Sequence, residues 1–408
     1  MKKSVLVSFF NSHNLGDCLI ADMLYEMVSE RFVTEKYSYS GKTPNIINSI
    51  NEINSQKLLK SNNIKGFIYK VLKKYDLNVF IYIYRMLKRG SKSYPEFETI
   101  IHNADIFVIG GGNMIFDIDK YSNSALRFNN LVSIAKKRGI KVYAISIGIG
   151  PFATLKQEKK AVEALTQCDY ISFRDQKSYD IYAKYSNELK DVYVSIDPVF
   201  FLPYSIKPSV TKNIIIGINV FNNKLINDSE EKYKQLINGY VKLAKGLSND
   251  LDTKIVLFST DLSDYPAVMD VYKCLSTEQN IEVRDIDGME SLVKLYSELS
   301  ILVGTRMHSM IIAYTQYIPI IGISWQQKVD ALFDIIDSKE SIFNYNNIER
   351  DSETIIDCCK RKLDNLEGEK DNIKETLNQI RNNRNIDRHI LTNLSQENYQ
   401  EHEHNTHM

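Results

Sequence analysis

The stretch Ile301-Leu-Val-Gly-Thr-Arg-Met-His-Ser-Met-Ile-Ile-Ala-Tyr314 decides the fold expected for this chain. Residues 301–303 are apolar and largely β-branched, which predicts a short buried strand, and Gly304 with the residue after it predicts a sharp turn. Apolar side chains then recur at helical spacing from Met307 to Tyr314. A strand, a turn and a helix in this order predict a parallel α/β sheet.

Arg306 and His308 fall in the first turn of that predicted helix, at the carboxyl end of the strand. Ligands of open α/β sheets bind at this edge, and the free N–H groups at a helix start favour anions. An Arg two residues before a His therefore predicts an anion clamp beside a proton donor. The alternative, an Arg in a surface ion pair and a His that caps its own helix, stays open.

The composition is that of an ordinary globular protein. The chain has 408 residues, of which 43% are apolar and 25% charged, and its formal net charge is zero. This length allows two domains, and the charge balance gives no indication of nucleic acid as a partner. The five cysteines lack metal-ligand spacing and predict reduced thiols. The first predicted strand begins at Ser4, and no apolar run approaches the roughly 20 residues that span a bilayer, so we expect a cytoplasmic protein.

The beginning of the chain repeats the strand–loop–helix pattern. Residues 5–10 predict a strand, residues 11–17 a loop, and residues 18–32 an amphipathic helix with Asp17 as its N-cap. Asn14 and Asp17 are candidate substrate-binding residues of this loop. A plain turn followed by a helix cap is the alternative.

A basic segment interrupts the alternation of strands and helices. Between residues 57 and 92 there are ten Lys or Arg and one acidic residue, Asp76. Apolar residues recur among them at helical spacing, which predicts one or two amphipathic helices with a cationic face, inserted at about residues 40–100. Two interpretations remain. Either this segment contacts an anionic membrane surface or a lipid-linked substrate, which would make the protein peripheral at the inner face of the membrane, or its basic face is simply solvated.

Three consecutive glycines follow a predicted strand at residues 105–109. They are Gly110, Gly111 and Gly112, with Asn113 after them, and we take all four as candidate substrate-binding residues. Glycines let backbone N–H groups approach a ligand without side-chain obstruction. The run is neither a P-loop nor a dinucleotide-binding fingerprint. A close-packed turn without a ligand is the alternative.

Arg174 follows another predicted strand, at residues 170–173, and is also a candidate substrate-binding residue. The carboxyl ends of parallel strands share one edge of the sheet, so we expect Arg174 and the glycine turns, including Gly148, to line a working cleft. An ion pair of Arg174 with Asp175 or Asp180 is the alternative.

A cluster of prolines marks the boundary between two halves of the chain. Three of the eight prolines fall within residues 198–208, which predicts a stiff crossover, and the strand–helix alternation restarts after it. Beyond residue 338 the chain is polar, and residues 349–383 predict helices that pack back across the first domain. We expect domains at 1–200 and 201–340, then a helical extension with a flexible tail at 341–408.

The residues available for chemistry are cationic or proton-donating. No His/Cys/Asp cluster has metal-ligand spacing, and no Gly-x-Ser-x-Gly elbow occurs. The histidines at 402, 404 and 407 indicate a disordered tail rather than a metal site. The remaining set suits a small, highly anionic substrate whose reaction needs protonation and charge neutralisation. It comprises Arg174, Arg306, His308 and Lys328, the last of which could equally be a solvated residue in the first turn of its helix.

Several pieces of this sequence resemble the polysaccharide pyruvyl transferase family, and they occur in the family's order over most of residues 1–340. They are Asn14-Leu-Gly-Asp17, Gly110-Gly-Gly-Asn113, Ser146-Ile-Gly-Ile-Gly-Pro151, Ser172-Phe-Arg-Asp-Gln-Lys-Ser178, Asp197-Pro198, Gly304-Thr-Arg-Met-His-Ser309 and Pro319-Ile-Ile-Gly-Ile-Ser-Trp-Gln-Gln-Lys328. Each piece alone is unspecific, whereas the ordered set is a fairly strong indication. The basic segment at 57–92 has no counterpart in the resemblance.

The resemblance implies an α/β fold of two Rossmann-like domains that face a cleft, similar to the GT-B glycosyltransferases, with the basic helical insertion in the first domain. It implies phosphoenolpyruvate as the donor substrate, with no cofactor and no metal. The product would be a cyclic pyruvate ketal on a sugar of a cell-surface polysaccharide or of its lipid-linked precursor. Arg306 and His308 would lie at the donor, and Arg174 would face them from the first domain.

The chemistry of phosphoenolpyruvate suits these residues. It carries a carboxylate and a phosphate, so two Arg side chains can each bind one anion. Protonation of the methylene carbon makes C2 electrophilic, and His308 is the candidate general acid, a role worth ~10²–10⁴-fold in rate. Whether His308 protonates carbon or only binds phosphate stays open, as do the acceptor sugar and the stereochemistry of the ketal.

Two other functions compete with this one. A nucleotide-sugar glycosyltransferase of GT-B type would share the architecture, but many such enzymes carry two Glu residues on the donor side, and no Glu occurs here between Glu298 and Glu340. A non-catalytic factor in envelope-polymer assembly would keep the fold without the activity. The intact pair of Arg306 and His308 argues against that second alternative.

Overall fold

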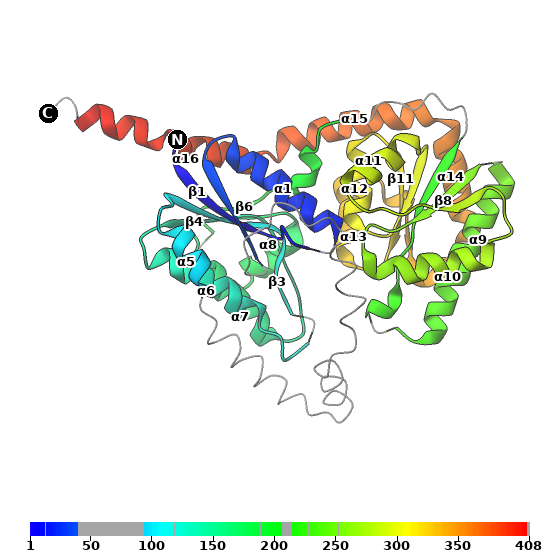
Figure 1. Cartoon of the computed structure of the whole chain (residues 1–408), viewed down its shortest axis with the longest axis horizontal. Coiled ribbons are helices and arrows are strands. Elements are labelled where there is room, and N and C mark those ends of the chain that lie inside the picture. The colour runs from blue at the N-terminus through cyan, green and yellow to red at the C-terminus, as the bar shows by residue number, and fades with distance from the viewer. Residues whose placement is uncertain are drawn as a thin grey trace. The chain divides into compact units, whose positions relative to one another are not determined.

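The computed structural model describes residues 1–12, 14–39, 94–117, 119–187, 189–205, 214–226, 228–251 and 253–405. The chain divides into two compact units, both visible in Figure 1. The first unit comprises residues 1–12, 17–198 and 384–408, and the second comprises residues 13–16 and 199–383. The basic segment at 57–92, with its predicted helices and membrane contact, lies outside the described residues.

In the described part of the first unit, six parallel strands form one sheet in the order β2-β1-β3-β4-β5-β6. The strands are β1 (Lys3–Ser8), β2 (Val33–Ser38), β3 (Ile106–Asp117), β4 (Lys141–Phe152), β5 (Tyr170–Phe173) and β6 (Val192–Val194). The helices are α1 (Leu15–Ser29), α5 (Pro95–Ile101), α6 (Ser124–Lys136), α7 (Leu155–Leu165), α8 (Gln176–Ala183) and α16 (Ile386–Asn405).

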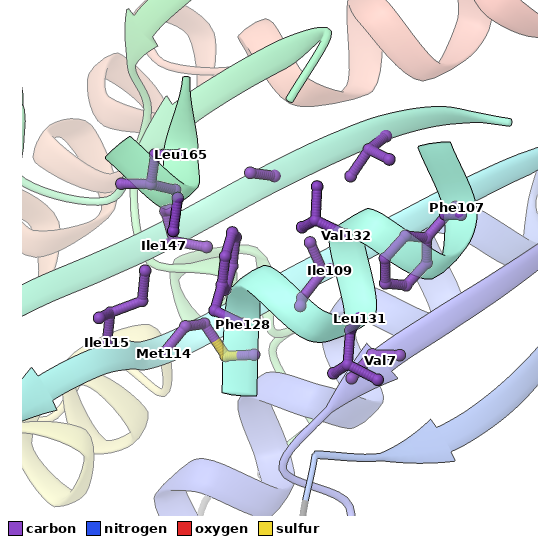
Figure 2. Close-up of a cluster of buried hydrophobic side chains, with 14 of the residues drawn as sticks. Val7, Phe107, Ile109, Met114, Ile115, Phe128, Leu131, Val132, Ile147 and Leu165 are labelled. Atoms are coloured by element: carbon purple, nitrogen blue, oxygen red, sulfur yellow. The ribbon is translucent and has the colours of Figure 1, made fainter. Parts of the chain in front are cut away.

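Alternate residues of each strand point to opposite faces of this sheet. Both sets are buried, so both faces of the sheet are covered. In β3, Phe107 and Ile109 pack with Phe128 of α6 in one apolar cluster, which Figure 2 shows. Val108, between them, packs in a second cluster with α1 and with Leu391 of α16. Strands buried on both faces are typical of parallel α/β sheets, which explains the continuous apolar runs in the sequence.

The described part of the second unit also has six parallel strands, in the order β12-β11-β10-β7-β8-β9. They are β7 (Ile215–Asn219), β8 (Lys254–Phe258), β9 (Ile281–Val283), β10 (Ile301–Gly304), β11 (Ile320–Ser324) and β12 (Ile342–Asn344). The helices are α9 (Glu230–Leu251), α10 (Tyr265–Leu275), α11 (Met289–Glu298), α12 (Met307–Thr315), α13 (Gln327–Ile335), α14 (Ser352–Asp364) and α15 (Leu366–Asn383). The two sheets confirm the α/β class with two Rossmann-like units.

Each sheet has one point at which the strand order reverses direction. In the second unit, the chain runs outward from β7 to β9, returns, and runs outward again on the other side from β10 to β12. The reversal therefore lies between β7 and β10, and in the first unit it lies between β1 and β3. Ligands of doubly wound sheets bind at the carboxyl ends of the strands that flank such a point.

The structure differs from the sequence predictions at three places. The glycine runs do not end their strands, because β3 continues through Gly112 to Asp117 and β4 continues through Gly148 to Phe152. The second sheet extends past residue 340, since β12 pairs with β11. Helices α14 and α15 belong to the second unit, and it is α16, the following helix, that belongs to the first.

Asp387, in the first turn of α16, is buried among hydroxyl groups of the first unit. It is 4% exposed and accepts hydrogen bonds from Tyr170 Oη (2.9 Å) and Ser195 Oγ (2.5 Å). Burial raises the pKa of its carboxyl, and the hydrogen bonds from serine and tyrosine oppose the rise only in part. This helix is therefore fixed to β5 and β6 by a carboxyl group that binds a proton more readily in the folded protein.

This carboxyl should make stability depend on pH. Because its folded pKa lies above the unfolded value, its stabilising contribution is complete at low pH and is lost as the pH rises through the folded pKa. Asp387→Asn removes that loss, so the variant should gain stability relative to the wild type between about pH 4, near the unfolded pKa of aspartate, and pH 8. Urea unfolding at both values measures the difference. Asp22→Asn, at an exposed site in the same unit, should keep a constant difference, and a constant difference for Asp387→Asn would contradict the prediction.

Candidate functional site

The β10–α12 turn lies at the reversal point of the second sheet. Strand β10 ends at Gly304, Arg306 is the N-cap of α12, and His308 is the second residue of that helix. This confirms the strand, turn and helix predicted for residues 301–314. Asn219, the last residue of the neighbouring strand β7, accepts a hydrogen bond at Oδ1 from the Arg306 backbone N–H (3.0 Å). The two strands that flank the reversal point are thus joined at their carboxyl ends.

The Arg306 side chain is held by two acidic residues that follow β8. Its Nε and Nη2 donate to the two carboxylate oxygens of Asp264 at 2.6 and 2.9 Å, and Nη2 lies 3.5 Å from Asp261 Oδ2. Asp264 is fully buried, and burial raises the pKa of its carboxyl against the lowering effect of Arg306. The ion pair that was the alternative for Arg306 is therefore present but largely buried, and an incoming anion would meet Arg306 with these carboxylates beside it.

Two aromatic rings complete the surroundings of the Arg306 guanidinium. Phe221 and Trp325 are stacked with centroids 4.4 Å apart, and the guanidinium carbon lies 5.2 and 5.5 Å from them. Such contacts add to the attraction between the cation and its surroundings. The Trp325 indole N–H also donates to the carbonyl of Thr305 (3.1 Å), which connects the end of β11 to the β10–α12 turn.

His308 is 6% exposed, and its imidazole lies against the backbone of Gly16. Residues 14–16 belong by their contacts to the second unit, and Asn14 forms a β-bridge with Asp261. The structure therefore brings Asn14 together with Arg306 and His308. Helix α1 begins at Leu15, so Asp17 lies in the first turn and is not the predicted N-cap; it accepts a hydrogen bond from Ser12 Oγ (3.2 Å).

Lys328 lies in the first turn of α13, the helix that follows β11. Its position after a strand of the second sheet places it on the same carboxyl edge as the β10–α12 turn. Its role in substrate binding stays a prediction.

Arg174, in the first unit, is 5% exposed and follows β5 directly. Its Nη1 donates to Asp197 Oδ2 (3.2 Å), its Nη2 donates to Asn113 Oδ1 (2.5 Å), and its Nε lies 3.7 Å from Asp175 Oδ2. Asp175 also caps α8 by accepting from Ser178 N–H (2.8 Å). The structure therefore joins Arg174 to Asn113 and also shows the ion pair with Asp175 that was the alternative for this residue, within a network that includes two carboxylates.

The absence of a side chain at Gly148 is what makes room for this network. A Cβ on Gly148 would lie 2.8 Å from Arg174 Nε and closer still to Asn113 Oδ1. Real Cβ atoms do not approach other atoms so closely, so a larger residue would displace the pair. The glycine in β4 therefore serves the Arg174 network, a role that the turn predicted at this position did not include.

The run from Gly110 to Gly112 is buried inside the sheet. Gly110 pairs with Ile145 of β4, and Ser8 Oγ donates to the Gly110 carbonyl (2.8 Å). Gly111 has φ +71°, a conformation that favours glycine, and packs against Ile20 of α1. Close packing therefore explains these glycines, and a direct contact with a ligand stays a prediction.

Sequence reasoning missed three polar residues of the second unit, namely Asn219, Asp261 and Asp264. Asn219 ends β7, which flanks the reversal point, and Asp261 and Asp264 follow β8, the strand on the outer side of β7. The rule that parallel strands end on one edge would have placed them there, but only once the strand order was known. That Arg174 faces Arg306 and His308 stays a prediction.

The described residues lack a membrane-spanning helix and a metal-binding cluster. Among the described helices, none combines the length and apolar character needed to cross a membrane. In the same part of the chain, no group of three or more His, Cys, Asp or Glu side chains is arranged to hold a metal ion.

Solved structures with the same architecture include two that were determined with UDP and one glycosyltransferase. HepE from Anabaena, solved with UDP and glucose, is 10% identical, with a TM-score of 0.53 over 97% of this chain and 100% of that one. A glycosyltransferase from Rickettsia africae is 13% identical, with a TM-score of 0.53 over 97% and 98%. MnaA from S. aureus, solved with UDP, is 11% identical, with a TM-score of 0.51 over 88% of each chain. At these identities the likeness shows the GT-B-like fold alone.

Sequence comparison identifies the family. No curated protein sequence matches the chain. The family described as polysaccharide pyruvyl transferase matches residues 14–327, which include Asn14, Arg174, Arg306 and His308. This match spans most of the chain and includes every described strand from β2 to β11, and the chain therefore belongs to the polysaccharide pyruvyl transferase family.

Proposed function

We propose that this protein transfers the pyruvyl group of phosphoenolpyruvate to a sugar of a cell-surface polysaccharide or of its lipid-linked precursor, and forms a pyruvate ketal. The observation that supports this most is the family match over residues 14–327, together with Arg306 as the N-cap and His308 in the first turn of α12 at the reversal point of the second sheet. That position is where doubly wound sheets bind their ligands.

The proposed reaction needs one proton donor and charge neutralisation. The C3 methylene of phosphoenolpyruvate takes a proton, C2 becomes electrophilic, and a sugar hydroxyl forms the first C2–O bond. The bond between C2 and the phosphate oxygen then breaks, inorganic phosphate leaves, and a second hydroxyl forms the second C2–O bond. Of the two hydroxyl protons, one returns to the donor that protonated C3, and the other goes to the oxygen of the departing phosphate. No oxidation or reduction occurs, so residues that donate protons and hold anions are sufficient.

His308 is the proposed proton donor, because it lies in the first turn of α12 beside Arg306. The N–H groups at the start of this helix favour a bound anion. Arg306 and Arg174 are proposed to bind the carboxylate and the phosphate, with Asp261, Asp264 and Asp197 fixing the two guanidinium groups. Lys328, from the neighbouring helix α13, would add positive charge at the same edge.

Ligand-dependent stabilisation tests the donor. Phosphoenolpyruvate at a hundredfold excess over its dissociation constant should stabilise the protein by about 2.7 kcal/mol, seen as a rise in melting temperature, because a ligand that binds only the folded state stabilises it by mass action. UDP-glucose and UDP-N-acetylglucosamine should have no such effect. A rise with a UDP-sugar and none with phosphoenolpyruvate would instead support a nucleotide-sugar glycosyltransferase.

The product gives a second readout of the same proposal. Incubation with phosphoenolpyruvate and a panel of free and lipid-linked glycosides should yield inorganic phosphate and a glycoside whose mass has increased by one ketal. Binding of phosphoenolpyruvate without turnover on any glycoside would leave the envelope-assembly factor as the better interpretation.

A further inference from the structure

Gly16 occupies a position where glycine is not the best residue for the local structure. It is the second residue of α1, where alanine would favour the helix by up to about 1 kcal/mol. Its φ does not lie in the left-handed region that only glycine adopts easily. The backbone conformation therefore gives no reason for glycine, and the reason must lie in the surroundings.

The surroundings of Gly16 are the imidazole of His308. A Cβ on residue 16 would lie 2.5 Å from His308 Cγ, and closer still to Nδ1 and Cβ. The imidazole cannot retreat easily, because every residue of α12 is buried and His308 itself is 6% exposed. The imidazole thus has a glycine backbone directly against it and a packed helix behind it.

Asn14 connects the same loop to the segment after β8 that contacts Arg306. Its Nδ2 donates to Asp261 Oδ2 (3.2 Å), and its Oδ1 accepts from the Gly16 backbone N–H (2.8 Å). The Leu15 backbone N–H donates to the Thr260 carbonyl (3.3 Å) beside it. Asp261 Oδ2, the acceptor of the Asn14 amide, also lies 3.5 Å from Arg306 Nη2. One loop therefore contacts both His308 and the carboxylate next to Arg306.

We propose that residues 14–16 are the positioning element of this site, with Gly16 as the positioning residue for the His308 imidazole and Asn14, through Asp261, for Arg306. The catalytic consequence rests on the proposed function, whereas the positioning itself does not. A displacement of about 1 Å in a reacting group can lower a rate about 10²-fold, so a single methyl group at residue 16 should be sufficient to lower turnover.

The test compares two substitutions that add the same methyl group in the second unit. Gly16→Ala places it against the imidazole, whereas Gly288→Ala, before α11, places it where no atom lies within 4 Å of the new Cβ and where φ is an ordinary extended value. The full chain is labelled at histidine, and the His308 imidazole resonances are identified by their absence in His308→Asn. Steady-state kinetics with phosphoenolpyruvate then measure kcat and KM for each variant.

Gly16→Ala should move the His308 resonances and lower kcat about 10²-fold, with KM for phosphoenolpyruvate nearly unchanged, while Gly288→Ala changes neither. His308 resonances unchanged in Gly16→Ala would overturn the inference whatever the activity. Resonances that move in a protein whose wild type makes no ketal would uphold the positioning and refute the proposed function instead. Should Gly16→Ala fail to fold, Asn14→Ala, which adds no atom and removes the acceptor that holds the Gly16 N–H against His308, must move the same resonances for the inference to stand.

Discussion

Arg306→Ala should lower the free energy of unfolding by about 3–5 kcal/mol, because it leaves a buried carboxylate without its partner. Asp264 is fully buried and receives both hydrogen bonds of the Arg306 fork, while the Arg306 side chain itself is only 13% exposed. Removing one partner of such a pair costs far more than the pair contributes when intact, since the remaining charge stays desolvated. A loss of activity in this variant alone would therefore say little about substrate binding.

Urea unfolding of three proteins measures this effect. The matched control is Arg350→Ala, in the same unit, because Arg350 also contacts an aspartate through Nε (2.7 Å) but its side chain is 73% exposed. The control should unfold close to the wild type, as exposed ion pairs contribute little. Equal stability of Arg306→Ala and Arg350→Ala would show that the buried pair does not hold this edge of the sheet.

The stability of Arg306→Ala should depend on pH, and this dependence separates the loss of the ion pair from any effect on substrate binding. Burial already raises the pKa of Asp264, while Arg306 and the Asn222 backbone N–H lower it, so removing the guanidinium takes away the larger opposing effect and raises that pKa further. A carboxyl with a raised folded pKa is least costly below its unfolded pKa and most costly once the pH has passed its folded pKa. Arg306→Ala should therefore lie closest to the wild type in stability near pH 4 and furthest from it at alkaline pH.

His308→Ala should lower turnover about 10²–10⁴-fold, the range typical of a lost general acid, and should change the dissociation constant of phosphoenolpyruvate less than about tenfold. The proposed anion contacts come from arginine side chains and from helix N–H groups, which the substitution leaves in place. Phosphate release under saturating acceptor measures turnover, and calorimetry measures binding.

Two further variants make this result interpretable. His308→Asn leaves a smaller cavity at a buried position, so agreement with His308→Ala would exclude a packing defect. His102→Ala, at an exposed site after α5, should have wild-type turnover. Normal turnover of both His308 variants would place the acid elsewhere, and equal losses in turnover and binding would make His308 a phosphate ligand.

The local part of the site could be predicted from the sequence because it depends on short-range patterns. The strand, the turn and the helix around Arg306 follow from apolar spacing within fourteen residues, and the structure confirms all three. The partners of Arg306 could not be predicted in the same way. Asp261 and Asp264 are more than forty positions away in the sequence, and their approach depends on β8 being the second strand from β10 in the sheet, which apolar spacing does not encode.

The glycines show why a correct observation led to a wrong strand boundary. Glycine marks turns, but it also occurs where two backbones or a backbone and a buried side chain approach closely. Gly110 and Gly148 are of the second kind, so β3 and β4 continue through them. A single sequence does not distinguish the two uses, because both need only the absence of a Cβ.

The return of α16 to the first sheet has a consequence for synthesis of the protein. Residues 384–405 supply Leu391, Leu394 and Asp387 to the interior of the first unit, yet they leave the ribosome after all of the second unit has been made. The part of the first sheet that packs against α16 therefore lacks this helix throughout translation of the intervening 185 residues, 199 to 383. N-terminal domains generally fold first during synthesis. Here the first unit can complete its fold only after α16, the last helix of the chain, has left the ribosome.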